Sequence, residues 1–195
     1  MKTSILKSTV AGAIALSIAA PAMAQEITAI TTGRTDHQLI YEVIEEGLIA
    51  LGYESNDMLT GAYPAIHLAL GQGDADYTAV HWKPLHNDFF ENGGGDDALV
   101  RVGPMYTAAM QAYYIDKATA DKHGITMLEQ LKQPEIAALF DTNGDGLANL
   151  TGCNPGWGCE KVIEHHLDAY ELRDHVNHDK GAYFALMADT IERFK

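Results

Sequence analysis

Residues 152–160, with the sequence GCNPGWGCE, contain two cysteines, one tryptophan and three glycines. Apolar residues at helical spacing follow over 159–172, so this stretch is predicted to be a loop that leads into a helix. The first backbone N–H groups of a helix have no partner inside the helix, and they attract anions. Trp157 adds an aromatic face, which attracts cations. The stretch therefore predicts a loop suited to a ligand that carries both charges.

The loop contains both cysteines of the chain, Cys153 and Cys159. In an oxidising compartment they are expected to form a disulfide that fixes the shape of the loop and contributes about 2 kcal/mol by the chain-entropy estimate. The rival interpretation is a thiol–disulfide enzyme. Such enzymes use the spacing C-x-x-C, whereas the spacing here is C-x5-C, so we favour the structural disulfide.

The first 24 residues indicate the compartment. Lys2 and Lys7 form a basic start, an apolar run follows, and Ala22-Met23-Ala24 provides small residues ahead of a cleavable bond. The apolar run is shorter than the roughly 20 residues that cross a bilayer. Residues 1–24 are therefore predicted to be a cleaved signal peptide, and the mature protein is predicted to work in the periplasm.

Segments with strand and helix patterns alternate along the mature chain. Strands are expected at 27–31, 53–59, 77–82, 99–102 and 110–115, and helices at 36–51, 65–70, 127–132, 135–140, 159–172 and 183–194. This alternation predicts an α/β fold with parallel strands. The chain is expected to change lobes after residue 109, which gives a first lobe at 25–109 and a second at 110–195.

A second candidate binding loop, HWKPLH at 81–86, follows the strand expected at 77–82. Open parallel sheets bind ligands beyond the carboxyl ends of their strands. Trp82 and His86 lie four residues apart in this loop. A tryptophan is often a core residue, and a histidine after a strand is often a packing residue. Position alone therefore leaves the binding role of both side chains open.

Composition and missing motifs narrow the possible functions. The formal charge of −14 argues against nucleic acid and anionic membrane surfaces as partners. The nine histidines include no H-E-x-x-H or paired Cys/His spacing, so no zinc site is predicted. No G-x-S-x-G motif or phosphate-binding glycine loop is present. We therefore predict a protein that is not an enzyme and has no cofactor and no metal.

Residues 141–146, DTNGDG, begin like a calcium-binding loop, with oxygen-bearing side chains at alternate positions and a glycine at the sixth. Gly152 stands at the twelfth position, where such a loop needs a glutamate. A turn rich in Asn, Asp and Gly is therefore favoured. A calcium-stabilised structural or interaction protein is kept as an alternative.

The chain resembles a known family. GCNPGWGCE, the following EKVIEHHLDAYEL, the later GAYFALMADTI and the upstream HWKPLH are similar to the glycine betaine/proline betaine-binding proteins of osmoprotectant ABC importers, the ProX type. The resemblance extends over residues 25–195. It implies a two-lobe periplasmic substrate-binding protein that captures glycine betaine, proline betaine or a similar quaternary-ammonium carboxylate and docks on a membrane permease.

The resemblance also implies a set of site residues. Trp82 and Trp157 would be two walls of an aromatic box around the quaternary ammonium. His86 and the backbone N–H groups of Gly158 and Cys159 would hold the carboxylate. A quaternary ammonium has no N–H to donate, so its recognition relies on cation–π attraction, about 0.5–2 kcal/mol per ring.

The chain departs from the family at its C-terminal side. Family members continue beyond the position of Lys195, with a third box tryptophan on a strand and a segment that returns to complete the first lobe. We therefore expect an incomplete two-lobe fold whose first lobe lacks its returning segment and has an uncovered apolar face. Weak binding, and dimerisation or aggregation, are expected unless a second polypeptide completes the lobe.

Overall fold

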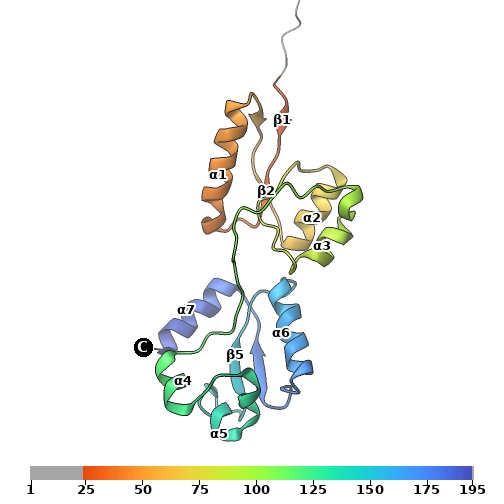
Figure 1. Cartoon of the computed structure of the whole chain (residues 1–195). Helices are drawn as coiled ribbons and strands as arrows, with labels where there is room; N and C mark the ends of the chain where they lie inside the picture. The colour runs from red at the N-terminus through yellow and green to blue at the C-terminus, as the bar shows by residue number, and fades with distance from the viewer. Residues whose placement is uncertain (1–23, 195) are drawn as a thin grey trace, which may run out of the picture.

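The computed structural model describes residues 24–194, so the predicted signal peptide lies outside the described residues except for Ala24. The helices and strands form two groups that a long extended segment connects (Figure 1). Within residues 24–194, none of the helices is both long enough and apolar enough to cross a membrane.

The first group contains short strands and the helices that follow them. Its elements are β1 (Glu26–Ile27), β2 (Ile30–Thr31), α1 (Thr35–Ala50), β3 (Glu54–Ser55), β4 (Leu59–Thr60), α2 (Tyr63–Gln72), α3 (Asn87–Asn92) and the 3-10 helix η1 (Gly95–Asp97). β1 pairs with β3 and β2 with β4, both in parallel. Tyr77 adds a parallel bridge to Ala29. The expected order of strand, helix and parallel strand is confirmed here.

The second group is built around one parallel pair. Its elements are α4 (Lys117–His123), the 3-10 helix η2 (Leu128–Lys132), α5 (Pro134–Ala137), β5 (Ala148–Thr151), α6 (Gly158–Ala169), β6 (Val176–Asp179) and α7 (Tyr183–Phe194). β5 and β6 pair over four residues, and α6 is the crossover between them. Sequence patterns missed both strands because ANLT and VNHD contain few apolar residues.

Three expected strands are wrong. In 77–82 only Tyr77 makes a bridge, and no residue from 99 to 115 belongs to a strand. An alternating apolar pattern forms a strand only where a neighbouring strand supplies hydrogen-bond partners. No described segment supplies them here, and the side chain of Val102 is 96% exposed. The segment is extended, as expected, but it is not part of a sheet.

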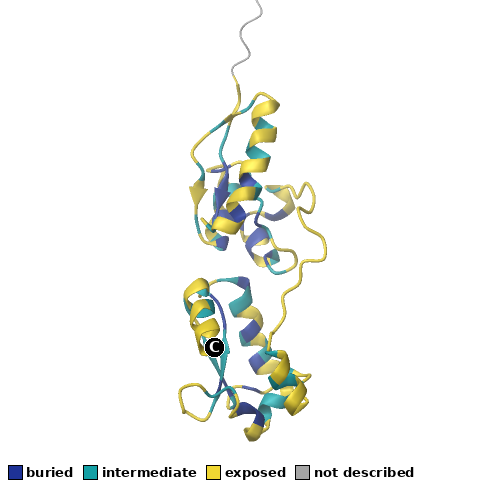
Figure 2. Cartoon of the chain, turned by 90° about the vertical axis from the view of Figure 1, so that its left-hand side faces the viewer, coloured by how far each residue is buried: buried dark blue, intermediate teal, exposed yellow. Residues whose placement is uncertain are grey.

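Each group has its own apolar core. The first core consists of Ala29, Ile30, Tyr41, Tyr63, Ile66, Ala75, Val80 and Phe89, and the second of Ala137, Ala148, Ile163, Leu167, Leu172 and Val176. Figure 2 shows these buried regions inside both groups and an exposed segment between them. Trp157, from the second group, packs against the first core. The lobe boundary at residue 109 stays a prediction.

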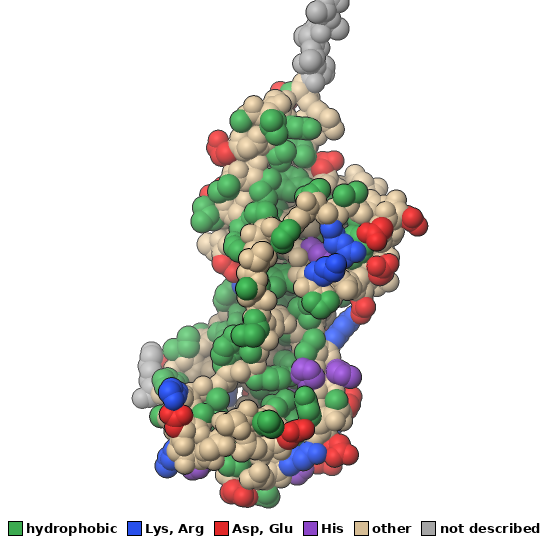
Figure 3. Space-filling view, viewed as in Figure 1, with side chains coloured by type: hydrophobic (Ala, Val, Ile, Leu, Met, Phe, Trp, Pro, Cys, Tyr) green, Lys and Arg blue, Asp and Glu red, His purple; other side chains and the backbone are tan. Residues whose placement is uncertain are grey.

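Hydrophobic side chains stay exposed on the first group, over α1 and along the extended segment (Figure 3). On α1, Leu39 is 67% exposed and Val43 is also exposed, although both belong to the apolar pattern that predicted this helix. The buried residues of α1 are His37 and Tyr41. The apolar side of α1 is therefore largely uncovered in the described part of the chain, as the expectation of an incomplete fold implied.

Tyr41 attaches α1 to the first core. Its side chain is fully buried, and its hydroxyl donates to the carbonyl oxygen of Ile30 at 2.8 Å. The same hydroxyl oxygen accepts from the N–H of Ala79 at 3.0 Å and lies 2.9 Å from Oγ1 of Thr78. One hydroxyl group thus satisfies backbone groups on two segments that are distant in sequence.

Replacing Tyr41 by Phe should lower the free energy of unfolding by about 1–3 kcal/mol, because the amide of Ala79 would be left without its partner. Urea denaturation followed by circular dichroism measures this change. Tyr114→Phe is the matched control, since Tyr114 is 84% exposed and the change should be within about 0.5 kcal/mol. Equal stability of the two variants would contradict the role assigned to Tyr41.

Glu164 on α6 connects this helix to the end of β6. Its carboxylate lies 2.8 Å from Nδ1 of His178 and 2.8 Å from Nζ of Lys180, and it also pairs with Arg173. The hydrogen bonds from Lys180, His178 and Arg173 lower the pKa of Glu164 from its usual 4.5 to about 2. The ionised form is therefore favoured in the folded protein.

Because the pKa of Glu164 is lowered on folding, its stabilising effect is complete above pH 4.5 and is lost as the pH falls toward about 2. The unfolding free energy of the native chain should fall more steeply over this range than that of Glu164→Gln. Denaturant midpoints measured at several pH values give the comparison. Parallel losses in the two proteins would contradict this role.

Candidate functional site

The start of α6 presents backbone N–H groups. Trp157 is the N-cap residue, and Gly158 and Cys159 are the first two residues of the helix. No side-chain hydrogen bond caps this end. The N–H groups of Gly158 and Cys159 have no acceptor within the helix, and they lie at the positive end of its dipole. This end of α6 therefore suits an anionic group.

The disulfide predicted between Cys153 and Cys159 is present, with the two Cα atoms 6.5 Å apart. It ties the loop to the first turn of α6, so that Trp157 lies inside the closed ring of residues. Glu160 closes the loop a second time, since its Oε2 accepts from the N–H of Gly156 at 2.6 Å. This hydrogen bond, followed by that of Lys180, lowers the pKa of Glu160.

The two candidate loops meet in the folded chain. The side chain of Leu85 packs so closely on Gly158 that a Cβ atom at this glycine would collide with it. Nearby, Nζ of Lys161 on α6 lies 3.1 Å from a carboxylate oxygen of Asp88 on α3. The HWKPLH loop therefore lies against the start of α6, although the two are far apart in the sequence.

His86 is buried, with 2% of its surface exposed, and its ring lies 4.3 Å from that of Tyr63 between centroids. The backbone N–H of Trp82 donates to its Nδ1 at 3.1 Å. Nδ1 is thus an acceptor, and Nε2 carries the proton that the ring can donate. Burial lowers the pKa of His86 to about 3, so the ring is neutral at neutral pH.

Aromatic rings around Trp157 already hold a positive charge. The ring of Trp157 lies 5.3 Å from Tyr63 and 6.0 Å from Tyr183 between centroids. The guanidinium carbon of Arg34 lies 5.7 Å from the centroid of Trp157, 5.8 Å from Tyr183 and 5.0 Å from Phe184. These distances are within the range of cation–π attraction. Arg34 also pairs with Asp36, which raises the pKa of the guanidinium.

The structure brings most of the predicted site residues together. Trp157, Gly158 and Cys159 are consecutive at the start of α6, and His86 reaches Trp157 through Tyr63, which contacts both rings. Trp82 is 38% exposed and joins the group through its backbone N–H on His86. Among residues 24–194, no ring contact links Trp82 with Trp157.

Sequence reasoning missed four aromatic or basic residues of this region: Arg34, Tyr63, Tyr183 and Phe184. Tyr183 and Phe184 lie in GAYFALMADTI, which was noted only for its resemblance to the family. Tyr63 stands directly before a proline at a helix start, a position that indicates the element boundary but not a binding role. Their contacts depend on how the two groups of elements meet, which no local pattern encodes.

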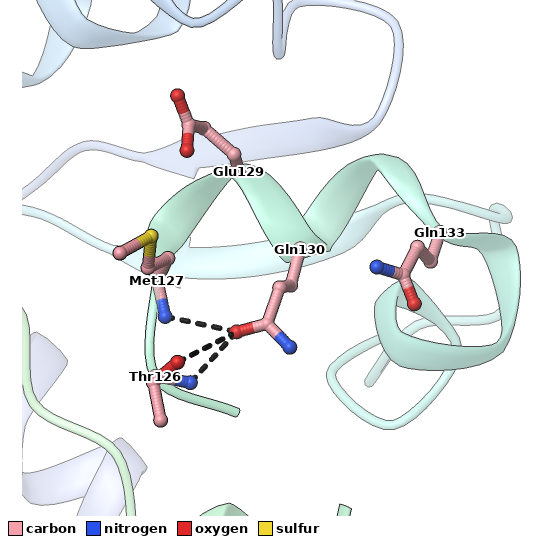
Figure 4. A pocket seen from close by; sticks show the side chains of 5 residues that line it. All are labelled: Thr126, Met127, Glu129, Gln130 and Gln133. Carbon is pink, nitrogen blue, oxygen red and sulfur yellow. Dashed lines mark hydrogen bonds between the residues drawn. The ribbon is translucent and has the colours of Figure 1, made fainter. Parts of the chain in front are cut away.

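Another hollow in the surface lies away from these residues. It is lined by Thr126, Met127, Glu129, Gln130 and Gln133 (Figure 4). Oε1 of Gln130 accepts from the N–H groups of Thr126 at 2.7 Å and of Met127 at 2.9 Å. The side chain of Gln130 is thus occupied in capping η2. None of the predicted site residues lines this hollow.

The loop at 141–146 forms a turn that satisfies its own polar groups. The carboxylate of Asp141 accepts from the N–H groups of Gly144 at 2.7 Å and Gly146 at 2.9 Å, and Oδ1 of Asp145 accepts from Leu147 at 2.9 Å. The hydrogen bond from Gly146 is the main reason that the pKa of Asp141 is lowered. These contacts favour the Asn/Asp/Gly turn over the calcium alternative.

Comparison with known proteins confirms the family resemblance. Residues 25–195 match the family model OpuAC, the substrate binding domain of ABC-type glycine betaine transport system. The chain is 50% identical to the glycine betaine-binding periplasmic protein OusX of Dickeya dadantii (strain 3937) over 153 residues. It is 52% identical to the glycine betaine/proline betaine-binding periplasmic protein of Escherichia coli (strain K12), also over 153 residues. Both alignments cover 78% of this chain but 46% of the relative, so the chain spans about half the length of these relatives.

Solved structures show the same fold at low sequence identity. A crystal structure of the glycine betaine, L-proline ABC transporter binding protein ProX from Borrelia burgdorferi has a TM-score of 0.67 at 16% identity, covering 88% of this chain and 60% of that one. Lactococcal OpuAC in its closed-liganded conformation with glycine betaine has a TM-score of 0.60 at 14% identity, covering 88% and 62%. These similarities confirm the predicted α/β substrate-binding-protein fold. Because the family model matches residues 25–195, the chain belongs to the family of substrate-binding domains of ABC-type glycine betaine transport systems.

Proposed function

We propose that this chain binds glycine betaine or a related quaternary-ammonium carboxylate, as the substrate-binding component of an ABC importer. The observation that carries the proposal is the position of Trp157. Its ring takes part in an aromatic group that holds a cation, and it directly precedes two N–H groups at the start of α6. A cation site and an anion site are thus one residue apart, which suits a small zwitterion.

The aromatic side of the site suits an ammonium ion without N–H groups. Such a cation cannot donate hydrogen bonds, so ring faces provide the attraction, about 0.5–2 kcal/mol for each ring. Trp157 and Trp82 are the proposed walls. The guanidinium of Arg34 marks where Trp157 and Tyr183 together attract positive charge. A trimethylammonium group would make the same kind of contact with the ring of Trp157.

The polar side of the site suits a carboxylate. The N–H groups of Gly158 and Cys159 are the proposed donors, and the helix dipole of α6 adds to their attraction. The third proposed donor is Nε2 of His86, which carries the proton because Nδ1 accepts from the N–H of Trp82. Three neutral donors bind an anion without requiring a charged side chain nearby.

The names of the relatives support the proposed role in an ABC importer. Both are periplasmic glycine betaine-binding proteins, in agreement with the signal peptide predicted at residues 1–24. We infer a periplasmic location, docking on a membrane permease, and reversible binding without a chemical step. The thiol enzyme has no support from the site, because the disulfide serves to shape the loop around Trp157.

Isothermal titration calorimetry of the folded chain should detect binding of glycine betaine and proline betaine, and weaker binding of choline, which has the ammonium but no carboxylate. Trp82→Ala and Trp157→Ala should each weaken betaine binding up to about thirty-fold, since one ring contributes up to about 2 kcal/mol. Tyr114→Ala, which removes an exposed ring in the segment between the two groups, should bind like the native chain.

Circular dichroism must show that each of these variants is folded. An absence of heat with all three compounds from the folded native chain would overturn the proposed function. Equal losses in Tyr114→Ala and Trp157→Ala would show that the aromatic contacts are not specific to this site.

Gly158→Ala should also weaken betaine binding, because the new methyl group would collide with Leu85 and push the two loops apart. Overpacking of this kind costs about 1–3 kcal/mol. The double variant Gly158→Ala with Leu85→Ala should recover part of the lost affinity in the same titration, because it removes the colliding side chain. Failure of the second substitution to recover any affinity would contradict the close approach of the two loops.

A further inference from the structure

Three histidines meet inside the first group of elements. His67 lies on α2, His81 follows the core residue Val80, and His86 precedes α3. One nitrogen atom from each ring can be chosen so that all three atoms lie within 4.8 Å of one another. His67 is 1% exposed and His86 2%, and His81 is half-buried. The cluster is therefore nearly closed to solvent.

Hydrogen bonds fix the orientation of two of the rings. Nδ1 of His67 lies 2.7 Å from the carbonyl oxygen of Tyr63, which can only accept, so Nδ1 carries the proton and Nε2 has a lone pair. This Nε2 lies 2.9 Å from Nδ1 of His81, so Nδ1 of His81 is the donor. Donation of a ring N–H to a backbone carbonyl is the usual way in which proteins orient a metal-binding histidine.

These tautomers leave an unused lone pair in the cluster. Nε2 of His81 is buried and has no hydrogen-bond partner in the described part of the chain. The third ring, His86, has its lone pair on Nδ1, where it now accepts the N–H of Trp82 at 3.1 Å. Each neutral ring thus has one nitrogen with a lone pair, and a metal ion would replace the hydrogen bonds that the lone pairs of His67 and His86 now accept.

The surroundings keep all three rings in the neutral form that metal binding requires. Burial lowers the pKa of His67, and it lowers the pKa of His81 to about 4 and of His86 to about 3. The positive charges of Arg101 and Lys83 add to the lowering at His81, and the rings of Phe89 and Phe90 pack against the cluster. A neutral imidazole has one nitrogen lone pair to donate to a metal ion.

We propose that His67, His81 and His86 form a binding site for one first-row divalent metal ion, such as zinc, nickel or copper, through three imidazole nitrogens with a fourth position open to water. Zinc–nitrogen bonds of about 2.0–2.1 Å place the nitrogens of a tetrahedral site about 3.3 Å apart, so nitrogens within 4.8 Å of one another need to approach by at most about 1.5 Å. Side-chain rotation of the half-buried His81 and a shift of the loop that carries His86 provide this movement.

Sequence spacing predicted no zinc site, because His67 lies on α2, apart from the loop that contains His81 and His86, and the three form no known metal-binding motif. The proposal does not rest on the proposed betaine binding, since the metal ion itself is measured. A failure of the metal proposal is therefore distinguishable from a failure of the betaine-binding proposal.

The experiment uses the full chain without an affinity tag, freed of metal by a chelator and titrated with zinc ions in a calorimeter. We expect one zinc ion per chain. In His81→Gln, zinc should bind at least about a hundredfold more weakly, because loss of a ligand should cost at least as much affinity as loss of a residue that only orients a ligand. The control variant His165→Gln removes an exposed histidine on α6 and should bind like the native chain. Circular dichroism checks that both variants are folded.

Pulsed electron paramagnetic resonance of the native chain with one equivalent of copper ions gives a second readout that needs no variant. It detects the remote nitrogens of coordinated imidazoles, and three are expected. The proposal is overturned if zinc does not bind saturably, if folded His81→Gln binds as tightly as the native chain, or if the copper spectrum shows fewer than three imidazoles. An equal loss of affinity in His165→Gln would likewise refute it by pointing to adventitious surface binding.

Discussion

The contact of Trp157 with Tyr63 is the interaction on which the candidate site depends. Their ring centroids are 5.3 Å apart, and through this contact a residue of the second group packs on the core of the first. Arg34, also from the first group, places its guanidinium carbon 5.7 Å from the centroid of the Trp157 ring. Because Trp157 is the N-cap residue of α6, the packing that joins the two groups fixes where the first N–H groups of that helix lie.

Two constraints in the chain make this contact possible. The disulfide between Cys153 and Cys159 holds the loop in a closed form, so Trp157 presents its ring without relying on a long stretch of regular structure. Gly158 lets the side chain of Leu85 approach the helix start, where any larger residue would collide. The proposed zwitterion site and the neutral ring of His86 therefore share one tightly packed boundary between the HWKPLH loop and α6.

Much of this was predictable from sequence because it is local. The position of α6, the disulfide and the turn at 141–146 follow from residue types at short spacing. The strands expected at 99–102 and 110–115 are wrong because strand formation needs a partner strand, which the local pattern does not specify. β5 and β6 were missed because their pairing across α6 supports segments with few apolar residues. The contacts of Arg34 and Tyr63 depend on tertiary packing, so only the structure could reveal them.

The most direct test of the account is an amide NMR comparison of the folded chain with and without saturating glycine betaine. The account predicts that the amide resonances of Gly158 and Cys159 and the indole resonances of Trp82 and Trp157 shift together along one binding curve. Resonances from the hollow lined by Thr126 and Gln133 should stay unchanged. Binding that shifts the resonances of this hollow and leaves those of Gly158, Cys159 and both indoles unchanged would contradict the proposed site.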